Sequence, residues 1–177
     1  MYKVKMDGQV LYYPGDKEAV LTNPTIKLQT GYAGTFEFTV PAINPLYDRI
    51  ENRRSMVSVF RDSTEIFYGE VRKRPKVDRY KNKGVYCAGA MSFLSDSIQP
   101  QAEYHDMSPR QLLGTFLDIH NSQVEDRKKI YLGIVTITDA NDSLYRFTNF
   151  ENTLKAIREK LVEKLGGYLR LRHVNDK

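Results

Sequence analysis

Residues 34–71 read GTFEFTVPAINPLYDRIENRRSMVSVFRDSTEIFYGEV, and this stretch combines strand, turn and breaker signals in one unit. Phe36, Phe38 and Val40 alternate with polar residues, a period of two that puts one side of a strand on a core and the other toward water. Pro41 cannot donate to a sheet ladder, so we expect the strand to end there. The stretch therefore predicts a half-buried strand followed at once by a turn.

The rest of this stretch predicts a helical turn and a β-hairpin. Asn44-Pro45 favours the start of a helical turn, because proline at a first helical position loses no donor that the helix needs. Val57 and Val59 form one strand pattern and residues 66–71 form another. Between them lies the polar stretch 61–64, which we expect to be a four-residue hairpin connection.

Strand signals also surround this unit. Residues 2–13 alternate around Asp7-Gly8, a dipeptide typical of a tight hairpin turn. Residues 25–30 and 85–88 give two further strand patterns. Short strands at close spacing, with no long crossover helix between them, favour a sandwich or a small barrel over a parallel sheet.

The pattern becomes helical after residue 100. Ser108 is expected to cap a helix, with Pro109 at its first position and Gln111 completing a capping box. Apolar residues then follow at helical spacing up to His120-Asn121. We expect His120 to cap the carbonyls at the end of this helix, and Asn121 to tolerate the left-handed conformation that stops it.

The last part of the chain alternates strand and helix patterns. A hairpin is predicted from strands at 130–138 and 144–148, with the turn at 139–143. A helix is predicted from the apolar stripe in 154–165, ending at Gly166, and a strand follows at 168–174. The sequence thus predicts an α+β protein. A mainly antiparallel, barrel-like or sandwich-like domain spans 1–100, and a small α+β domain with two amphipathic helices spans 101–177.

Composition limits the classes of function. The chain has 177 residues, of which 41% are hydrophobic and 28% charged, ordinary values for a globular protein. Its apolar runs are far shorter than the roughly 20 residues of a membrane-spanning helix, so we expect no membrane partner and synthesis in a cytoplasm. The single cysteine, Cys87, suits a small buried strand position.

Positive charge gathers in one segment. Residues 72–83 contain seven basic residues and one acidic residue, Asp78; the basic residues are Arg72, Lys73, Arg74, Lys76, Arg79, Lys81 and Lys83. Such a cluster could contact phosphates, an anionic membrane or an acidic protein surface. It could also be a solvated hairpin whose outward lysines discourage edge pairing.

No residue pattern indicates catalysis or metal binding. The three histidines, His105, His120 and His173, lie in different segments without zinc-ligand spacing. A strand cysteine among apolar neighbours lacks the electropositive setting that activates a thiolate. We therefore predict no catalytic residue, no metal and no cofactor.

The order of these blocks resembles the N-terminal region of bacteriophage and prophage tail hub proteins, the prophage tail and tail-associated lysin family, which is baseplate-hub-like. The matching blocks of the opening stretch are GTFEFTVP, NPLYDRI, MVSVF and IFYGEV. Residues 85–97, 108–121 and 151–171 resemble later blocks of the same family. The resemblance covers nearly the whole chain, and none of its blocks is a catalytic signature.

This resemblance implies a structural role in a virion tail. The expected function is that of a hub or tip component that joins the tail tube to the distal tip. Its partners would be other copies of itself in a homotrimeric ring, the tail-tube, distal-tail and tip subunits, and phage DNA that passes through the channel without specific recognition. Wall-degrading activity of tail-associated lysins belongs to later domains, so the chain is expected to be truncated relative to the family. The alternatives are part of a cell-wall-degrading tail lysin and a polyanion- or nucleic-acid-binding domain.

Overall fold

The computed structural model describes residues 1–139 and 145–174, and the chain divides into two compact units. Unit 1 consists of Met1–Ala90 together with Arg172–Lys177, and unit 2 consists of Met91–Leu171. The chain therefore leaves unit 1 once and returns to it. That residues 1–100 and 101–177 form separate domains stays a prediction.

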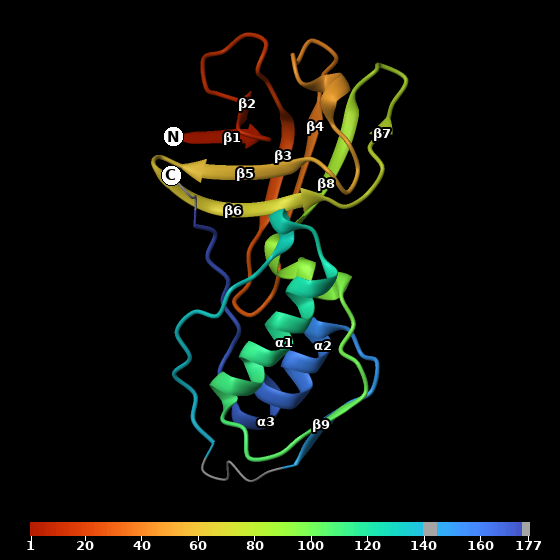
Figure 1. The fold of residues 1–177 in the computed structure, drawn as a ribbon. Coiled ribbons are helices and arrows are strands. Elements are labelled where there is room, and N and C mark those ends of the chain that lie inside the picture. Colours follow the sequence, from red (N-terminus) through yellow and green to blue (C-terminus); the bar gives the residue numbers. More distant parts are fainter. Residues whose placement is uncertain (140–144, 175–177) are drawn as a thin grey trace. The chain divides into compact units, whose positions relative to one another are not determined.

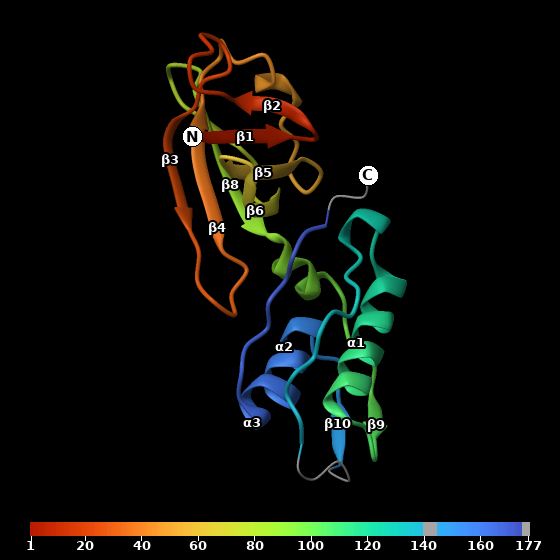
Figure 2. The same cartoon turned by 90° about the vertical axis from the view of Figure 1, so that its left-hand side faces the viewer.

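Unit 1 is a curled antiparallel sheet (Figures 1 and 2). The strand order is β2-β1-β5-β6-β8-β4-β3, and the short β7 also pairs with β8. The strands are β1 (Tyr2–Met6), β2 (Gln9–Tyr12), β3 (Thr22–Lys27), β4 (Thr35–Val40), β5 (Met56–Arg61), β6 (Thr64–Val71), β7 (Lys76–Val77) and β8 (Lys83–Gly89). A 3-10 helix, Tyr47–Arg49, follows β4. This half-barrel confirms the predicted antiparallel β-rich architecture.

The predicted alternation builds the core of unit 1. Phe36, Phe38 and Val40 of β4 are buried, and they belong to the same apolar cluster as Val57 and Val59 of β5. Other members come from the remaining strands and from the turn after β4; they are Val4, Met6, Leu11, Leu46, Ile50, Phe67, Val71, Val85 and Cys87. One face of the sheet thus encloses the core, because side chains alternate between the two faces.

Two turns show where the sequence was informative and where it was not. Asp7 and Gly8 both have positive φ, 49° and 81°, as a two-residue hairpin turn requires, so the predicted β1–β2 hairpin is confirmed. The predicted four-residue connection between β5 and β6 is wrong. Arg61 pairs directly with Thr64, which leaves a two-residue connection in which Asp62 takes the positive φ.

Unit 2 packs three helices and a small ribbon. A 3-10 helix, Ala90–Asp96, leads into β9 (Ala102–Tyr104) and α1 (Pro109–Gln123). After a further 3-10 turn, Asp126–Lys128, β10 (Arg146–Thr148) pairs antiparallel with β9. The C-terminal helix runs as α2 (Thr153–Ile157), a π-helical stretch (Arg158–Val162) and α3 (Glu163–Leu165). Helices α1 and α2 lie side by side in both ribbon views (Figures 1 and 2).

The predicted start of α1 and the predicted end of the second helix are confirmed, but Asn121 does not stop α1, because it is helical and the helix continues to Gln123. Ser108 caps α1, its side chain accepts from the Gln111 amide, and Gln111 closes the capping box. The second helix ends at Gly166, whose φ is 78°, the left-handed region that glycine enters without a steric cost. None of the described helices has both the length and the apolar character needed to cross a membrane.

The strands predicted late in the chain are mostly wrong. Residues 130–138 and 168–174 are all described, and neither segment forms a strand. Strand β10 pairs with the distant β9 instead, so the expected partner at 130–138 is absent. The predicted turn at 139–143 and the start of the strand at Leu144 fall largely on residues 140–144, outside the described residues.

Candidate interaction surface: the basic hairpin

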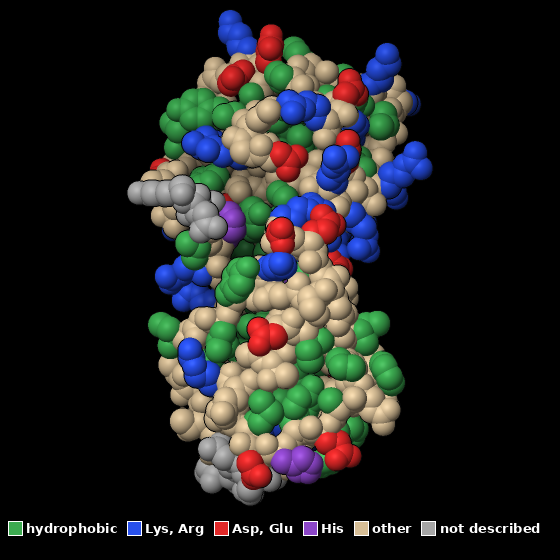
Figure 3. Space-filling view, in the orientation of Figure 1, with side chains coloured by type: hydrophobic (Ala, Val, Ile, Leu, Met, Phe, Trp, Pro, Cys, Tyr) green, Lys and Arg blue, Asp and Glu red, His purple; other side chains and the backbone are tan. Residues whose placement is uncertain are grey.

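The seven basic residues predicted as a surface lie on a β-hairpin, residues 72–83, which we call the basic hairpin. Lys76 pairs with Gly84 and Val77 with Lys83, so β7 and β8 form the two arms. At the tip, the amide of Asp78 donates to the Asn82 carbonyl at 2.9 Å. Figures 1 and 3 show this hairpin at the margin of unit 1, where several Lys and Arg side chains are visible.

The one acidic side chain in the hairpin organises the tip. Oδ1 of Asp78 accepts from the amides of Tyr80 and Asn82, both at 2.8 Å, and Oδ2 accepts from Asn82 Nδ2 at 3.1 Å. The hydrogen bonds from Asn82, backbone first, lower the pKa of the exposed Asp78 carboxyl. Asp78 is therefore a turn-forming residue, and its oxygens are already engaged.

Three of the seven cations are held by unit 1 itself. Arg72 Nε lies 3.0 Å from Glu70 Oε2, and both side chains are almost fully buried. Lys73 Nζ lies 4.3 Å from the centre of the Tyr86 ring. Lys83 Nζ lies 4.0 Å from the centre of the Tyr47 ring and donates to the carbonyl of the same residue. Arg72 and Lys83 are partly buried against the sheet and the turn after β4, whereas Lys73 is exposed and contacts unit 1 only through the Tyr86 ring.

The other four cations, Arg74, Lys76, Arg79 and Lys81, are exposed. Arg79 stacks over the ring of Tyr80, with 4.7 Å between the guanidinium carbon and the ring centre. No carboxylate of the described residues pairs with any of the four. The sequence predicted the cluster, but it could not separate these four cations from the three that fold back onto aromatic rings or Glu70.

A shallow hollow lies beside the base of the hairpin. It has a volume of about 360 Å³ and is lined by Arg74, Pro75, Lys83 and residues 50–52. The Glu51 carboxylate on its rim forms an ion pair with Arg54 at 3.1 Å. The hollow is an extension of the surface and lacks the enclosed apolar lining of a small-molecule site.

The histidines are dispersed over three environments. His105 is exposed on unit 2, with Nε2 3.6 Å from Glu103 Oε2. His173 belongs to unit 1; its ring stacks on Tyr68 with 3.5 Å between centres, and its Nδ1 lies 2.7 Å from Glu65 Oε2. Among residues 1–139 and 145–174, no group of three or more His, Cys, Asp or Glu side chains is placed to hold a metal ion.

The prediction that His120 caps the end of α1 is wrong. His120 is a fully buried residue of the helix, which continues to Gln123. Its Nε2 lies 3.1 Å from the Lys128 carbonyl and its Nδ1 2.7 Å from Ser97 Oγ. A carbonyl can only accept, so Nε2 carries the proton and Ser97 donates to Nδ1. Thr153 and Gln99 extend this hydrogen-bond network. Ser97 Oγ lies 2.6 Å from Thr153 Oγ1, and Gln99 Nε2 donates to Thr153 Oγ1 at 2.8 Å.

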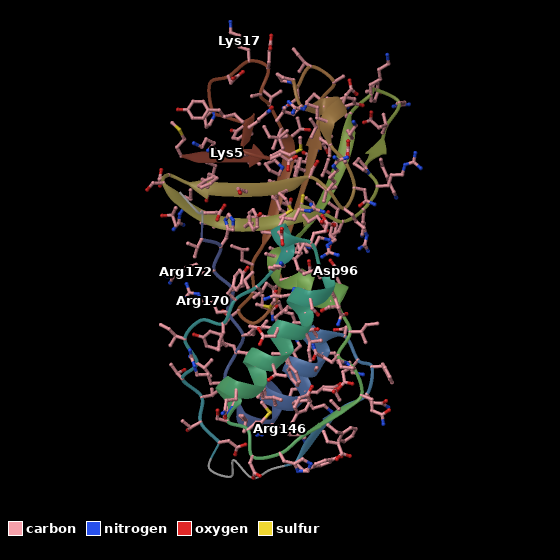
Figure 4. The ribbon with its side chains drawn as sticks, in the orientation of Figure 1. Lys5, Lys17, Asp96, Arg146, Arg170 and Arg172 are labelled. Atoms are coloured by element: carbon pink, nitrogen blue, oxygen red, sulfur yellow. The ribbon has the colours of Figure 1, made fainter. Side chains whose placement is uncertain are left out.

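This buried network is structural. Ser97 is 1% exposed and His120 0%, so a substrate has no access to the hydroxyl. Burial lowers the pKa of His120 against the smaller opposing effects of the Lys128 carbonyl and Asp96. Asp96 itself pairs with the buried Lys128 at 3.1 Å, and Figure 4 marks its position. The sequence missed this network because its members are 23 to 56 residues apart.

The cysteine carries no accessible nucleophile. Cys87 lies in the core of unit 1 and is 0% exposed. Burial raises the pKa of its thiol far above the usual range, which keeps the sulfur protonated and unreactive.

Comparisons with known proteins agree with the tail-protein resemblance at the level of the fold. No protein-family model and no curated protein matches the chain. The crystal structure of the prophage MuSo2 43 kDa tail protein from Shewanella oneidensis matches with a TM-score of 0.54 and 16% identity, over 92% of this chain and 47% of that one. The tail protein from Neisseria meningitidis MC58 matches with a TM-score of 0.43 and 14% identity, over 66% of this chain and 33% of that one. The chain thus spans less than half the length of either protein, and its fold is similar to that of a prophage tail protein.

Proposed function

We propose that this chain is a structural component of a phage or prophage tail, and that it acts by assembly with other tail proteins and not by catalysis. The observation that carries the proposal is the similarity of its fold to the MuSo2 tail protein over 92% of the chain. The blocks that carry the sequence resemblance support it, because they form β4, the turn after it and the β5–β6 hairpin of the curled sheet.

Within the tail, we propose a place in the hub or tip, where the chain would form a homotrimeric ring between the tail tube and the distal tip. The open sheet of unit 1 supports an assembled state. Strands β2 and β3 end the sheet, and edge strands present backbone groups that another chain can pair with. Partners of this kind would be a second copy or the tail-tube and tip subunits. The chain would be made in the bacterial cytoplasm and reside in the virion tail.

The two edge strands of the sheet, β2 and β3, each have features that limit pairing with another chain. On β3, Asn23 has a positive φ of 50° and Pro24 follows it, and both features discourage pairing. On β2, the Leu11 carbonyl already accepts from Asn44 Nδ2 at 2.9 Å. We therefore expect side-chain surfaces, including the basic hairpin, to contribute more to assembly than continuous strand pairing across these edges.

Disruption of the gene tests the proposal. We expect particles without functional tails, seen as heads and incomplete tails by electron microscopy, and recovery of intact tails when the gene is supplied in trans. Solution mass tests the ring separately: the proposal expects a species of three chains of 20.5 kDa. Normal tails in the disrupted strain would overturn the tail role. If the tails do depend on the gene but the purified protein has a mass other than that of three chains, only the trimer is overturned.

A further inference from the structure

We propose that the basic hairpin binds the phosphate backbone of nucleic acid without reading its sequence. This inference concerns the exposed cations of the hairpin and does not depend on the tail assignment.

The available charge is strongly positive. Arg74, Lys76, Arg79 and Lys81 are exposed, and no carboxylate of the described residues pairs with them. Both oxygens of Asp78 accept hydrogen bonds inside the turn, so this carboxylate does not reach the four cations as a partner. Unneutralised cations gathered on one exposed element are the electrostatic footprint of a phosphate-binding surface.

The cations lie on a narrow two-stranded element with an unusual turn. Lys81 has a φ of 62°, a left-handed conformation that Gly or Asn adopts far more readily in such turns. The turn thus holds a lysine at a position where Gly or Asn would be less strained. The hairpin is a two-stranded ribbon at the margin of the sheet (Figure 1), and a two-stranded ribbon is narrow enough to enter the major groove of duplex DNA.

The exposed ring at the tip favours nucleic acid over an acidic protein surface. Tyr80 is 68% exposed, with Arg79 over its ring. An aromatic ring among cations is a feature of surfaces that bind nucleic acid, whereas an acidic protein partner would need the charges alone.

The test measures binding of a short fluorescent DNA duplex by anisotropy while salt is raised from about 50 to 200 mM. We expect a Kd of about 10⁻⁶ to 10⁻⁴ M at physiological salt and a slope of log affinity against log salt of about −3.6, since each of the four phosphate contacts contributes about −0.9. Duplexes of unrelated sequence should bind equally. The variant R74Q/K76Q/R79Q/K81Q should lose at least tenfold in affinity and most of the slope.

A matched control separates the hairpin from net charge. The variant K17Q/K27Q/K164Q/R170Q removes the same charge from exposed positions, two of which, Lys17 and Arg170, are marked in Figure 4, and it should bind like the native chain. If the hairpin variant does not fold, the four single substitutions replace it, each reducing the slope by about 1.

Three outcomes would overturn the proposal. Equal losses in both quadruple variants would assign binding to net charge. Polyglutamate that binds as tightly as DNA, with the same dependence on the hairpin, would assign the surface to an acidic protein. Absence of DNA binding even at low salt would reject an anionic ligand of this class.

Discussion

The buried side chain of Asn44 joins three backbone segments of unit 1. Its Nδ2 donates to the Leu11 carbonyl at 2.9 Å and to the Val20 carbonyl at 3.0 Å, while its Oδ1 accepts from the Leu46 amide at 3.0 Å. The sequence marked Asn44-Pro45 as a turn, but nothing local indicated that the amide would reach β2, 33 residues away. A polar group this buried is important because its loss leaves several backbone groups without a partner.

We expect Asn44→Ala to lower the free energy of unfolding by about 3 kcal/mol, because it leaves two carbonyls and one amide unsatisfied in the core. Chemical denaturation checks this value. Asn52→Ala, at an exposed position close by in the sequence, should change stability by less than about 0.5 kcal/mol. Similar effects of the two substitutions would contradict the role given to Asn44.

Gly89 is required by a close approach of two backbones. A Cβ at this position would lie 1.7 Å from the Ala33 carbonyl oxygen, whereas at Gly84 on the same strand the nearest atom would be 3.7 Å away. Gly89→Ala should therefore destabilise unit 1 by about 3 kcal/mol or more, and Gly84→Ala should be neutral or stabilising by up to about 1 kcal/mol. Thermal unfolding of the two variants compares them directly, and equal melting temperatures would contradict the geometry.

At the scale of elements, helix α1 joins the rest of unit 2 through the network of Ser97, His120 and Thr153. The ring of His120 is buried, and burial lowers its pKa in the folded state, because it disfavours the charged form. The unfolded chain then binds the proton more readily, and stability must fall as the pH drops below the ordinary pKa. Acidification should therefore weaken the packing of α1 against the other elements.

We expect the helical circular dichroism signal, which comes from α1, α2 and α3 of unit 2, to be lost at lower denaturant as the pH falls below 6.5, the ordinary pKa of histidine. Above that pH the full contribution of His120 to the free energy of unfolding is present. His120→Gln should be less stable near neutral pH but should lose this part of the pH dependence. His105→Gln, at an exposed histidine, should retain it; loss of the dependence in that variant instead would contradict the assignment.

The sequence predicted elements whose signals are local. The Asp7-Gly8 turn, the capping box of α1 and the glycine stop at Gly166 each depend on a few adjacent residues, and all three are confirmed. The alternation in 130–138 satisfied the strand pattern, yet no strand formed there, because a strand also needs a partner and β10 pairs with β9 instead. Pairing across some 40 residues is invisible to periodicity.

For the basic hairpin too, the sequence predicted the local features and missed those that depend on distant residues. The seven cations of the basic hairpin were evident from the sequence, since they are neighbours along the chain. Their division into engaged and exposed groups depended on Tyr47, Tyr86 and Glu70, which come from other turns and strands. Sequence reasoning therefore located the surface but could not identify the four cations that are free to contact a partner.

At the scale of the whole molecule, the chain combines unit 1, which holds the curled sheet, with the helical unit 2, and it returns to unit 1 at Arg172. His173 fixes this return through its stack on Tyr68 and its contact with Glu65. Among the described residues, Ser97 and His120 belong to a buried network, and no group of three or more His, Cys, Asp or Glu side chains is placed to hold a metal ion. The fold of this chain is similar to that of a prophage tail protein.

Localisation in purified particles tests this account most directly. Tails are isolated from lysates of the strain that encodes the chain, and the chain is labelled with a specific antibody for immunoelectron microscopy. The account predicts that the label lies at the distal end of each tail and is absent from tails of the gene-disrupted strain. Purified, intact tails that lack the chain, while it is abundant in the unassembled fraction, would contradict a structural role in the tail.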